Sequence, residues 1–132
     1  MKDQTYLQVL HAVAQDYRDQ LNWSNPSNAH EHRDDLYVVA YNGHTEGLLT
    51  PVKSGRDVGT FNYSGTILTA KRCTLLEARR IAQQSVQEAR EHAPAYPCTF
   101  EVVSVLDIAL RINERVPKLL TSVELMLARY KG

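Results

Sequence analysis

The sequence lacks an excess of charge of either sign. Lysine and arginine together number 15, as do aspartate and glutamate, so the formal net charge at neutral pH is zero. A general nucleic-acid binder needs a basic excess to displace counterions from phosphates, and a protein that mimics DNA needs the opposite excess. The composition therefore argues against both classes, although it is compatible with a local patch of either sign.

Long hydrophobic runs and cysteines are also scarce. No apolar run approaches the ~20 residues that span a bilayer, and Asp3 and Gln4 fall where a signal peptide has its apolar segment. Cys73 and Cys98 flank a predicted helix whose ends would lie roughly 27 Å apart, which is too far for a disulfide. We therefore expect two free thiols and a cytoplasmic protein without membrane contacts.

Three stretches have the hydrophobic spacing of amphipathic helices. The first runs from Asp3 to Leu21. The central helix follows Thr74, which forms the pattern of a capping box with Glu77, and it ends before Pro94. Pro117 suits the first turn of a final helix.

The intervening segments predict strands. Asn42-Gly43, a dipeptide typical of hairpins, separates the first two strands. The clearest strand, Thr99 to Leu106, either continues to Ile112 or gives way to a helical turn near Asp107. Polar segments predict loops at residues 22–35 and 53–59, and strands are predicted at residues 36–41, 48–52, 60–63, 66–69 and 99–106.

The order of these elements predicts an α+β fold. A mainly antiparallel sheet of three or four strands would carry the central amphipathic helix, with helices flanking it at the N- and C-termini. The length of 132 residues is enough to bury one core without metals or disulfides. We therefore expect a single α+β domain over residues 1–132.

The segment His30 to Asp34 spells H-x-H-x-D, the metal-binding string of metallo-β-lactamase-like hydrolases. In that family the string follows a buried strand, and further ligands come from later in a much longer chain. Here the string follows a polar loop, and only His44 and His92 remain downstream. A small metal-dependent hydrolase using His30, His32 and Asp34 is one alternative. We favour a solvated loop, with neither metal nor other cofactor.

Signatures of nucleophilic catalysis are weak as well. The sequence has no G-x-S-x-G elbow and no phosphate-binding loop with its lysine. Cys73 lies between Arg72 and a predicted helix N-terminus, a setting that lowers a thiol pKa. We favour a buried structural cysteine, because free cysteine is among the most buried residue types. We expect a protein that is not an enzyme.

A basic cluster is predicted around the start of the central helix. Cations beside a positive helix end favour an anion, such as a phosphate or the carboxylates of a partner. The glycine-rich loop at residues 53–59 would add two more cations if it folds alongside. The alternative is a solvated basic face. The residues are Lys71, Arg72, Arg79 and Arg80 at the helix, with Lys53 and Arg56 in the loop.

From Leu36 onward, a strand and a hairpin with the segment L-T-P-V precede A-K-R (70–72), T-x-x-E-A (74–78) and E-V-V-S-V (101–105). This order resembles small uncharacterised proteins encoded by phages and prophages, which carry a strand pair, an A-K-R-F-T-x-x-E-A helix and a final V-x-V strand. The chain departs from them at Cys73, where an aromatic is usual, and in its terminal helices. The resemblance covers about half the chain and implies stoichiometric host-interaction roles, including anti-CRISPR-like inhibition of antiviral defence.

We therefore expect a non-catalytic binding protein of the host cytoplasm that inhibits or sequesters a host component. A protein partner would depend on exposed aromatic residues such as Trp23 and Tyr63. A nucleotide-like signal would depend instead on Lys71, Arg72 and Arg56. An architectural subunit that self-assembles into a homo-oligomer through its first or last helix is the remaining alternative.

Overall fold

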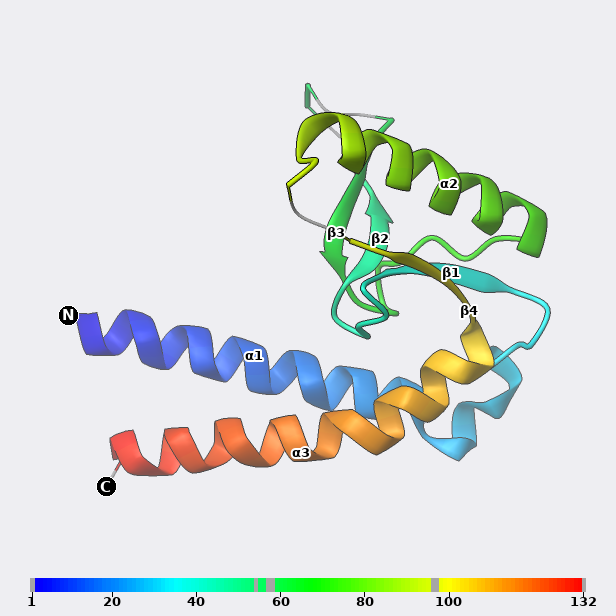
Figure 1. Cartoon of the computed structure of the whole chain (residues 1–132). Coiled ribbons are helices and arrows are strands. Elements are labelled where there is room, and N and C mark those ends of the chain that lie inside the picture. Colours follow the sequence, from blue (N-terminus) through cyan, green and yellow to red (C-terminus); the bar gives the residue numbers. More distant parts are fainter. Residues whose placement is uncertain (1, 54, 57–58, 96–97, 132) are drawn as a thin grey trace. The chain divides into compact units, whose positions relative to one another are not determined.

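The computed structural model of the chain describes residues 2–53, 55–56, 59–95 and 98–131 (Figure 1). Within these residues an antiparallel sheet is accompanied by helices, so the predicted α+β class is confirmed. In chain order the elements are the helix α1 (Lys2–Ser24), the 3₁₀ helix η1 (Pro26–Glu31), the strands β1 (Tyr37–Tyr41), β2 (Leu48–Pro51) and β3 (Phe61–Gly65), the helix α2 (Leu75–His92), the strand β4 (Phe100–Ser104) and the helix α3 (Val105–Lys131).

The chain divides into two compact units. The helix unit consists of residues 1–29 and 109–132, and the sheet unit consists of residues 30–108. The prediction of a single domain over residues 1–132 stays a prediction.

The sheet has the strand order β3-β2-β1-β4, and each neighbouring pair is antiparallel. The hairpin between β1 and β2 turns at Asn42 and Gly43, whose φ angles are 53° and 75°. Asparagine and glycine tolerate this left-handed region, which explains why the dipeptide predicted the hairpin. β1 also pairs with β4, with Tyr37 opposite Ser104 and Tyr41 opposite Phe100. Within the described residues, β3 and β4 are therefore the edge strands.

α2 covers one face of the sheet (Figure 1). Its side chains Ala78, Ile81 and Ala82 are buried against sheet residues that include Val39 and Phe100. The small alanine side chains let the helix axis approach the strands closely. The helix begins as predicted, because the Thr74 hydroxyl accepts a hydrogen bond from the Glu77 amide at 3.3 Å.

β4 leads into α3 without a connecting residue. The Ser104 hydroxyl accepts a hydrogen bond from the Asp107 amide at 3.1 Å and so caps the helix. Of the two alternatives left open for this segment, the helical one is therefore confirmed, with a start at Val105. The prediction for Pro117 is wrong, because this residue lies inside α3 and not in the first turn of a separate helix.

Two predicted boundaries also need correction. The loop at residues 22–35 is partly helical, since α1 extends to Ser24 and η1 follows. The Asn25 side chain accepts a hydrogen bond from the Ser27 amide at 2.9 Å, which favours a turn at this point. Residues 66–69 form a turn, closed by the Ala70 amide on the Thr66 carbonyl oxygen at 2.8 Å, where a strand was predicted.

In the helix unit, α1 and α3 lie side by side and run in opposite directions (Figure 1). Leu10, Ala14 and Leu127 are buried between them, and the rings of Tyr6 and Tyr130 meet edge to face with centroids 5.2 Å apart. The helical stripe predicted for α1 is thus the face that packs. Of the helices in the described part of the chain, none is both long and apolar enough to cross a bilayer.

Candidate binding groove

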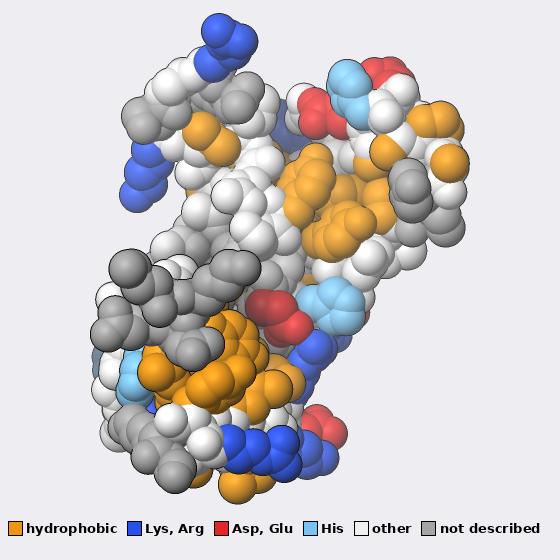
Figure 2. Space-filling model, turned by 90° about the vertical axis from the view of Figure 1, so that its left-hand side faces the viewer, with side chains coloured by type: hydrophobic (Ala, Val, Ile, Leu, Met, Phe, Trp, Pro, Cys, Tyr) orange, Lys and Arg blue, Asp and Glu red, His pale blue; other side chains and the backbone are white. Residues whose placement is uncertain are grey.

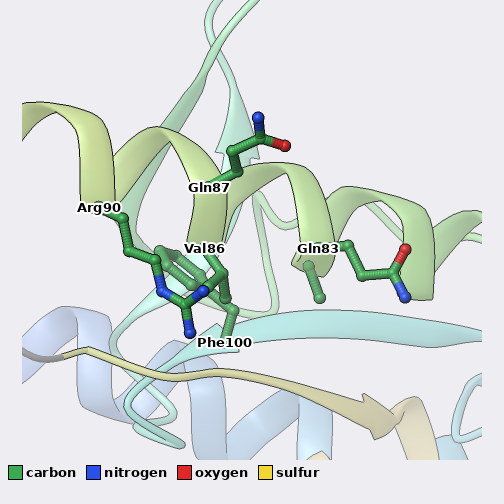
Figure 3. A pocket seen from close by; sticks show the side chains of 6 residues that line it. Gln83, Val86, Gln87, Arg90 and Phe100 are labelled. Atoms are coloured by element: carbon green, nitrogen blue, oxygen red, sulfur yellow. The ribbon is translucent and has the colours of Figure 1, made fainter.

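The sheet unit has an open hollow between α2 and the edge strand β4, with a volume of about 460 Å³. We call it the α2–β4 groove. Figure 3 shows Val86 and Arg90 directed from α2 toward the strand, with the Phe100 ring rising from β4 and Gln87 pointing away. The lining residues are Ala82, Gln83, Val86, Gln87, Arg90 and Phe100.

The floor of the groove is an aromatic cluster. The Phe100 ring, which is 9% exposed, meets the rings of Tyr41 and Tyr63 edge to face with centroids 5.5 and 5.2 Å away. Tyr41 and Tyr63 are themselves stacked at 5.7 Å. Burial raises the pKa of the Tyr63 phenol, and the nearby Glu88 carboxylate raises it further. Packed aromatic rings with few rotamers give a rigid apolar base on which a partner could rest.

The two sides of α2 differ in charge because of the helical repeat. Successive residues of a helix are about 100° apart around its axis. A sector of roughly 60° on the β4 side of α2 therefore contains Arg79, Gln83, Val86 and Arg90. Glu77, Gln84 and Glu88 fall on the β3 side, where Gln84 and Glu88 line a smaller hollow of about 80 Å³. The β4 side of α2 is therefore basic and amide-rich, whereas the β3 side is acidic.

The structure brings together two of the six residues predicted for an anion site. Lys53 and Arg72 line one depression of about 630 Å³, together with Thr50 and Thr69. The hydroxyl oxygens of these threonines lie 3.2 Å apart. The Arg72 guanidinium also donates a hydrogen bond to the Ile67 carbonyl oxygen at 3.1 Å, which holds it against the turn.

The other predicted cations are arranged differently. Lys71 Nζ lies 3.3 Å from Glu77 Oε1, so its charge is balanced at the start of α2. Arg79 and Arg80 are exposed on α2, and Arg56 is exposed in the loop before β3. Within the described residues these three do not line the depression that contains Lys53 and Arg72.

The two aromatic residues predicted for partner binding lie in different units. Trp23 is 7% exposed at the end of α1, so its indole offers little surface to a partner. Tyr63 is half-buried in β3 beneath α2 and belongs to the aromatic cluster at the groove. Tyr63 is thus the member of the pair that remains close to a candidate site.

The H-x-H-x-D string lies on the surface of the sheet unit. His30 and Asp34 are exposed, and His32 is half-buried. Arg33 Nε donates to Asp35 Oδ1 at 2.8 Å, which raises the pKa of Arg33 and lowers the pKa of Asp35. Among the described residues, His, Cys, Asp and Glu side chains form no group of three or more that could hold a metal ion.

Cys73 is buried, and its thiol donates to the Tyr37 carbonyl oxygen with a sulfur–oxygen distance of 3.7 Å. Burial raises the pKa of this thiol, and the Glu77 carboxylate adds to the effect. The lowered pKa considered from the sequence is therefore wrong, because desolvation outweighs the attraction of Lys71. Both cysteines are free, as predicted.

A separate apolar patch lies on the helix unit. Figure 2 shows hydrophobic side chains gathered near the ends of the two helices. Tyr6, Val9, Met126 and Tyr130 are exposed large hydrophobic residues of α1 and α3. Such a patch is compatible with several kinds of contact, and its residues do not specify one of them.

We found no significant match of this chain to a protein-family model, to a curated protein sequence or to a solved structure. The sequence analysis did not identify Val86, Gln87 and Phe100 as residues of one groove. The signal that could have indicated them is the repeat of Arg79, Gln83, Val86 and Arg90 along one side of α2.

Proposed function

We propose that this chain is a non-catalytic binding protein that sequesters or inhibits a host component, and that a protein partner occupies the α2–β4 groove. The observation that carries this proposal is the groove itself, an open hollow with Phe100 in its floor and Arg90 at its rim. An apolar floor with a polar rim is the usual anatomy of a recognition surface.

The resemblance to phage and prophage proteins supports a host component as the partner, including a protein of an antiviral defence system. Such an inhibitor acts by occupying its target in a fixed ratio. It therefore needs a rigid surface more than reactive groups. The packed contact between α2 and the sheet supplies that rigidity.

A steric block tests the proposal. Gln83→Trp places a large ring in the groove, whereas Arg80→Trp places the same ring on the solvent side of the same helix. We expect the tagged wild-type protein and Arg80→Trp to retain one host protein from lysate in near-equal molar amount. We expect Gln83→Trp to retain at least about tenfold less. Equal retention by all three proteins would contradict the role of the groove.

A second candidate function is the binding of a nucleotide-like anion in the depression beside β2. Lys53 and Arg72 are two cations on one hollow, and Thr50 and Thr69 add hydroxyl groups suited to phosphate oxygens. ATP is the probe. Titration calorimetry should show binding that Lys53→Gln weakens and that Gln83→Trp leaves unchanged. Absence of ATP binding to the wild-type protein, or equal binding to Lys53→Gln, would remove this candidate.

A further inference from the structure

We propose that the partner segment is an extended acidic peptide that adds as a new strand along the outer edge of β4, beneath the basic side of α2. The inference rests on the proposed function and specifies how the α2–β4 groove would be used. It follows from three independent features: the free hydrogen-bonding groups of β4, the charges of α2 and the position of Glu101.

The hydrogen bonds between β1 and β4 determine which backbone groups of β4 face outward. The Val105 amide donates to the Leu36 carbonyl oxygen at 2.9 Å, and the Asn42 amide donates to the Thr99 carbonyl oxygen at 2.8 Å. In an antiparallel pair the residues that bond to the neighbour alternate, so residues 99, 101, 103 and 105 face β1. The amide and carbonyl groups of Phe100 and Val102 therefore point away from the sheet.

Those outward groups have no hydrogen-bond partner among the described residues. An edge strand with free amide and carbonyl groups is a template for another strand, and many peptide-binding domains use this mode of recognition. Small molecules could also occupy the hollow. Only an extended backbone, however, satisfies a row of alternating donors and acceptors.

The charges at the rim select an acidic segment. Arg79 and Arg90 are 11 residues apart, which places them within roughly 20° of each other around α2 and about 16 Å apart along it. Within the described residues, neither forms an ion pair. An added strand covers about 16 Å with roughly five residues, so carboxylates near both of its ends could reach the two guanidinium groups.

Successive side chains of the added strand would point alternately toward α2 and toward the opposite face of the sheet. Those on the α2 side enter the groove above Phe100, beside Val86 and Gln83. Glu101 has the opposite parity to Phe100, so its carboxylate lies on the other face of the sheet. A peptide carboxylate directly opposite Glu101 would be repelled, and the acidic residues are therefore expected at the positions that face α2.

The alternative role of Glu101 is protection of the edge, because a charged residue in an edge strand hinders pairing with other chains. A second copy of this chain is an alternative occupant of the same edge. Symmetric pairing of two β4 strands through the outward groups of Phe100 and Val102 would set Glu101 of one copy opposite Thr99, Glu101 or Val103 of the other. None of these arrangements places a carboxylate beside Arg79 or Arg90.

Selection of random dodecapeptides displayed on phage against the purified full-length protein tests the inference. We expect the enriched peptides to combine β-branched residues with at least two carboxylates. Fluorescence anisotropy of a labelled selected peptide should show saturable binding. Binding should weaken at least about tenfold for the double variant Arg79→Glu/Arg90→Glu and stay unchanged for the control Arg80→Glu.

A backbone-methylated form of the selected peptide separates strand addition from charge alone. Methylation of alternate amides removes the donors that would face β4, so we expect binding to fall by at least about tenfold. Peptides without carboxylates, undiminished binding of the methylated peptide, or no enrichment at all would overturn strand addition. Light scattering could show a dimer of both the wild-type protein and the double variant Arg79→Glu/Arg90→Glu. That result would indicate that a second copy of the chain occupies the edge of β4. The wild-type protein could retain a host protein that Gln83→Trp fails to retain and yet bind no peptide. That result would overturn strand addition and support the proposed function.

Discussion

Ser24 and Asn113 form a reciprocal hydrogen-bonded pair that joins α1 to α3. The Ser24 hydroxyl donates to Asn113 Oδ1 at 2.7 Å, and Asn113 Nδ2 donates to the Ser24 carbonyl oxygen at 3.1 Å. Ser24 is 1% exposed, so its groups have almost no access to water. At the end of α1 no further turn of the helix donates to the Ser24 carbonyl oxygen, and Asn113 Nδ2 supplies that hydrogen bond.

Asn113→Ala should therefore destabilise the protein. The substitution removes the donor to the buried Ser24 carbonyl, whereas the hydroxyl keeps the Leu21 carbonyl oxygen as an acceptor at 3.2 Å, so the expected cost is about 1–2 kcal/mol in the free energy of unfolding. Urea denaturation followed by circular dichroism measures the change. Ser122→Ala is the control, because the Ser122 hydroxyl is exposed and donates only to the Lys118 carbonyl within the same helix. Equal stability of both variants would show that the pair contributes nothing.

Pro117→Ala should stabilise the protein. Pro117 is exposed in the interior of α3 and has no amide hydrogen for the carbonyl of Asn113, one turn earlier. Alanine restores that donor and removes the ring, with an expected gain of about 1–3 kcal/mol in the free energy of unfolding. Thermal denaturation measures the change, with Lys118→Ala as a control for the effect of alanine at a neighbouring exposed site. A lower melting temperature would contradict the prediction and indicate that the packing of α3 on α1 requires proline at this position.

Thr74→Ala should weaken the start of α2. The hydroxyl of Thr74 is the acceptor for the Glu77 amide, and its loss at a helix N-cap costs about 1 kcal/mol. Thr74→Ser keeps the acceptor and should remain within a few tenths of a kcal/mol of the wild-type protein. Urea denaturation of the wild-type protein and the two variants measures these differences in the free energy of unfolding. Similar losses in both variants would point to the threonine methyl group instead of the cap.

The two cysteines should differ in reactivity toward iodoacetamide. Cys73 is buried with a raised pKa, so its thiolate is scarce at neutral pH, whereas Cys98 is half-buried. We expect Cys98 to be alkylated at least about tenfold faster in the native protein. Both residues should react at similar rates in urea. Mass spectrometry of peptides measures the ratio, and faster alkylation of Cys73 would contradict its burial.

The raised pKa of Cys73 also predicts a loss of stability in mild alkali. Below the ordinary thiol pKa of about 8.5 both states hold the proton, and the contribution of Cys73 is complete. As the pH rises through that value toward the raised pKa, the unfolded chain releases its proton first, so the free energy of unfolding falls. Cys73→Ala should show a shallower decline between about pH 8 and 9.5. An identical slope would contradict the prediction.

Local signals explain most of what the sequence predicted correctly. Thr74 with Glu77, and Asn42 with Gly43, each determine a local backbone conformation through groups only a few residues apart. The same kind of signal was available at Ser104 and Asp107, and it marks the start of α3. Pro117 was misinterpreted because proline favours a first turn, yet the packing of a long helix can override that preference.

The groove could not be predicted in the same way because it depends on strand order. Phe100 borders the groove because β4 pairs with β1 at the edge of the sheet, a contact between segments about 60 residues apart. The arrangement of the six predicted cations also depends on contacts between distant segments. Charge counting does not reveal that Glu77 balances Lys71, or that the turn at residues 66–69 brings Arg72 beside Lys53.

The strand β4 ends at Ser104 and the helix α3 begins at Val105, so the two-residue repeat of a strand passes directly into the 3.6-residue repeat of a helix. A slip of β4 by a single residue against β1 would exchange the two faces of the strand, because its side chains alternate. The same slip would turn the side chains of the first turn of α3, from Val105 to Ile108, by about 100° about the helix axis. No linker residue separates Ser104 from Val105, so the register of β4 also determines which side chains begin α3.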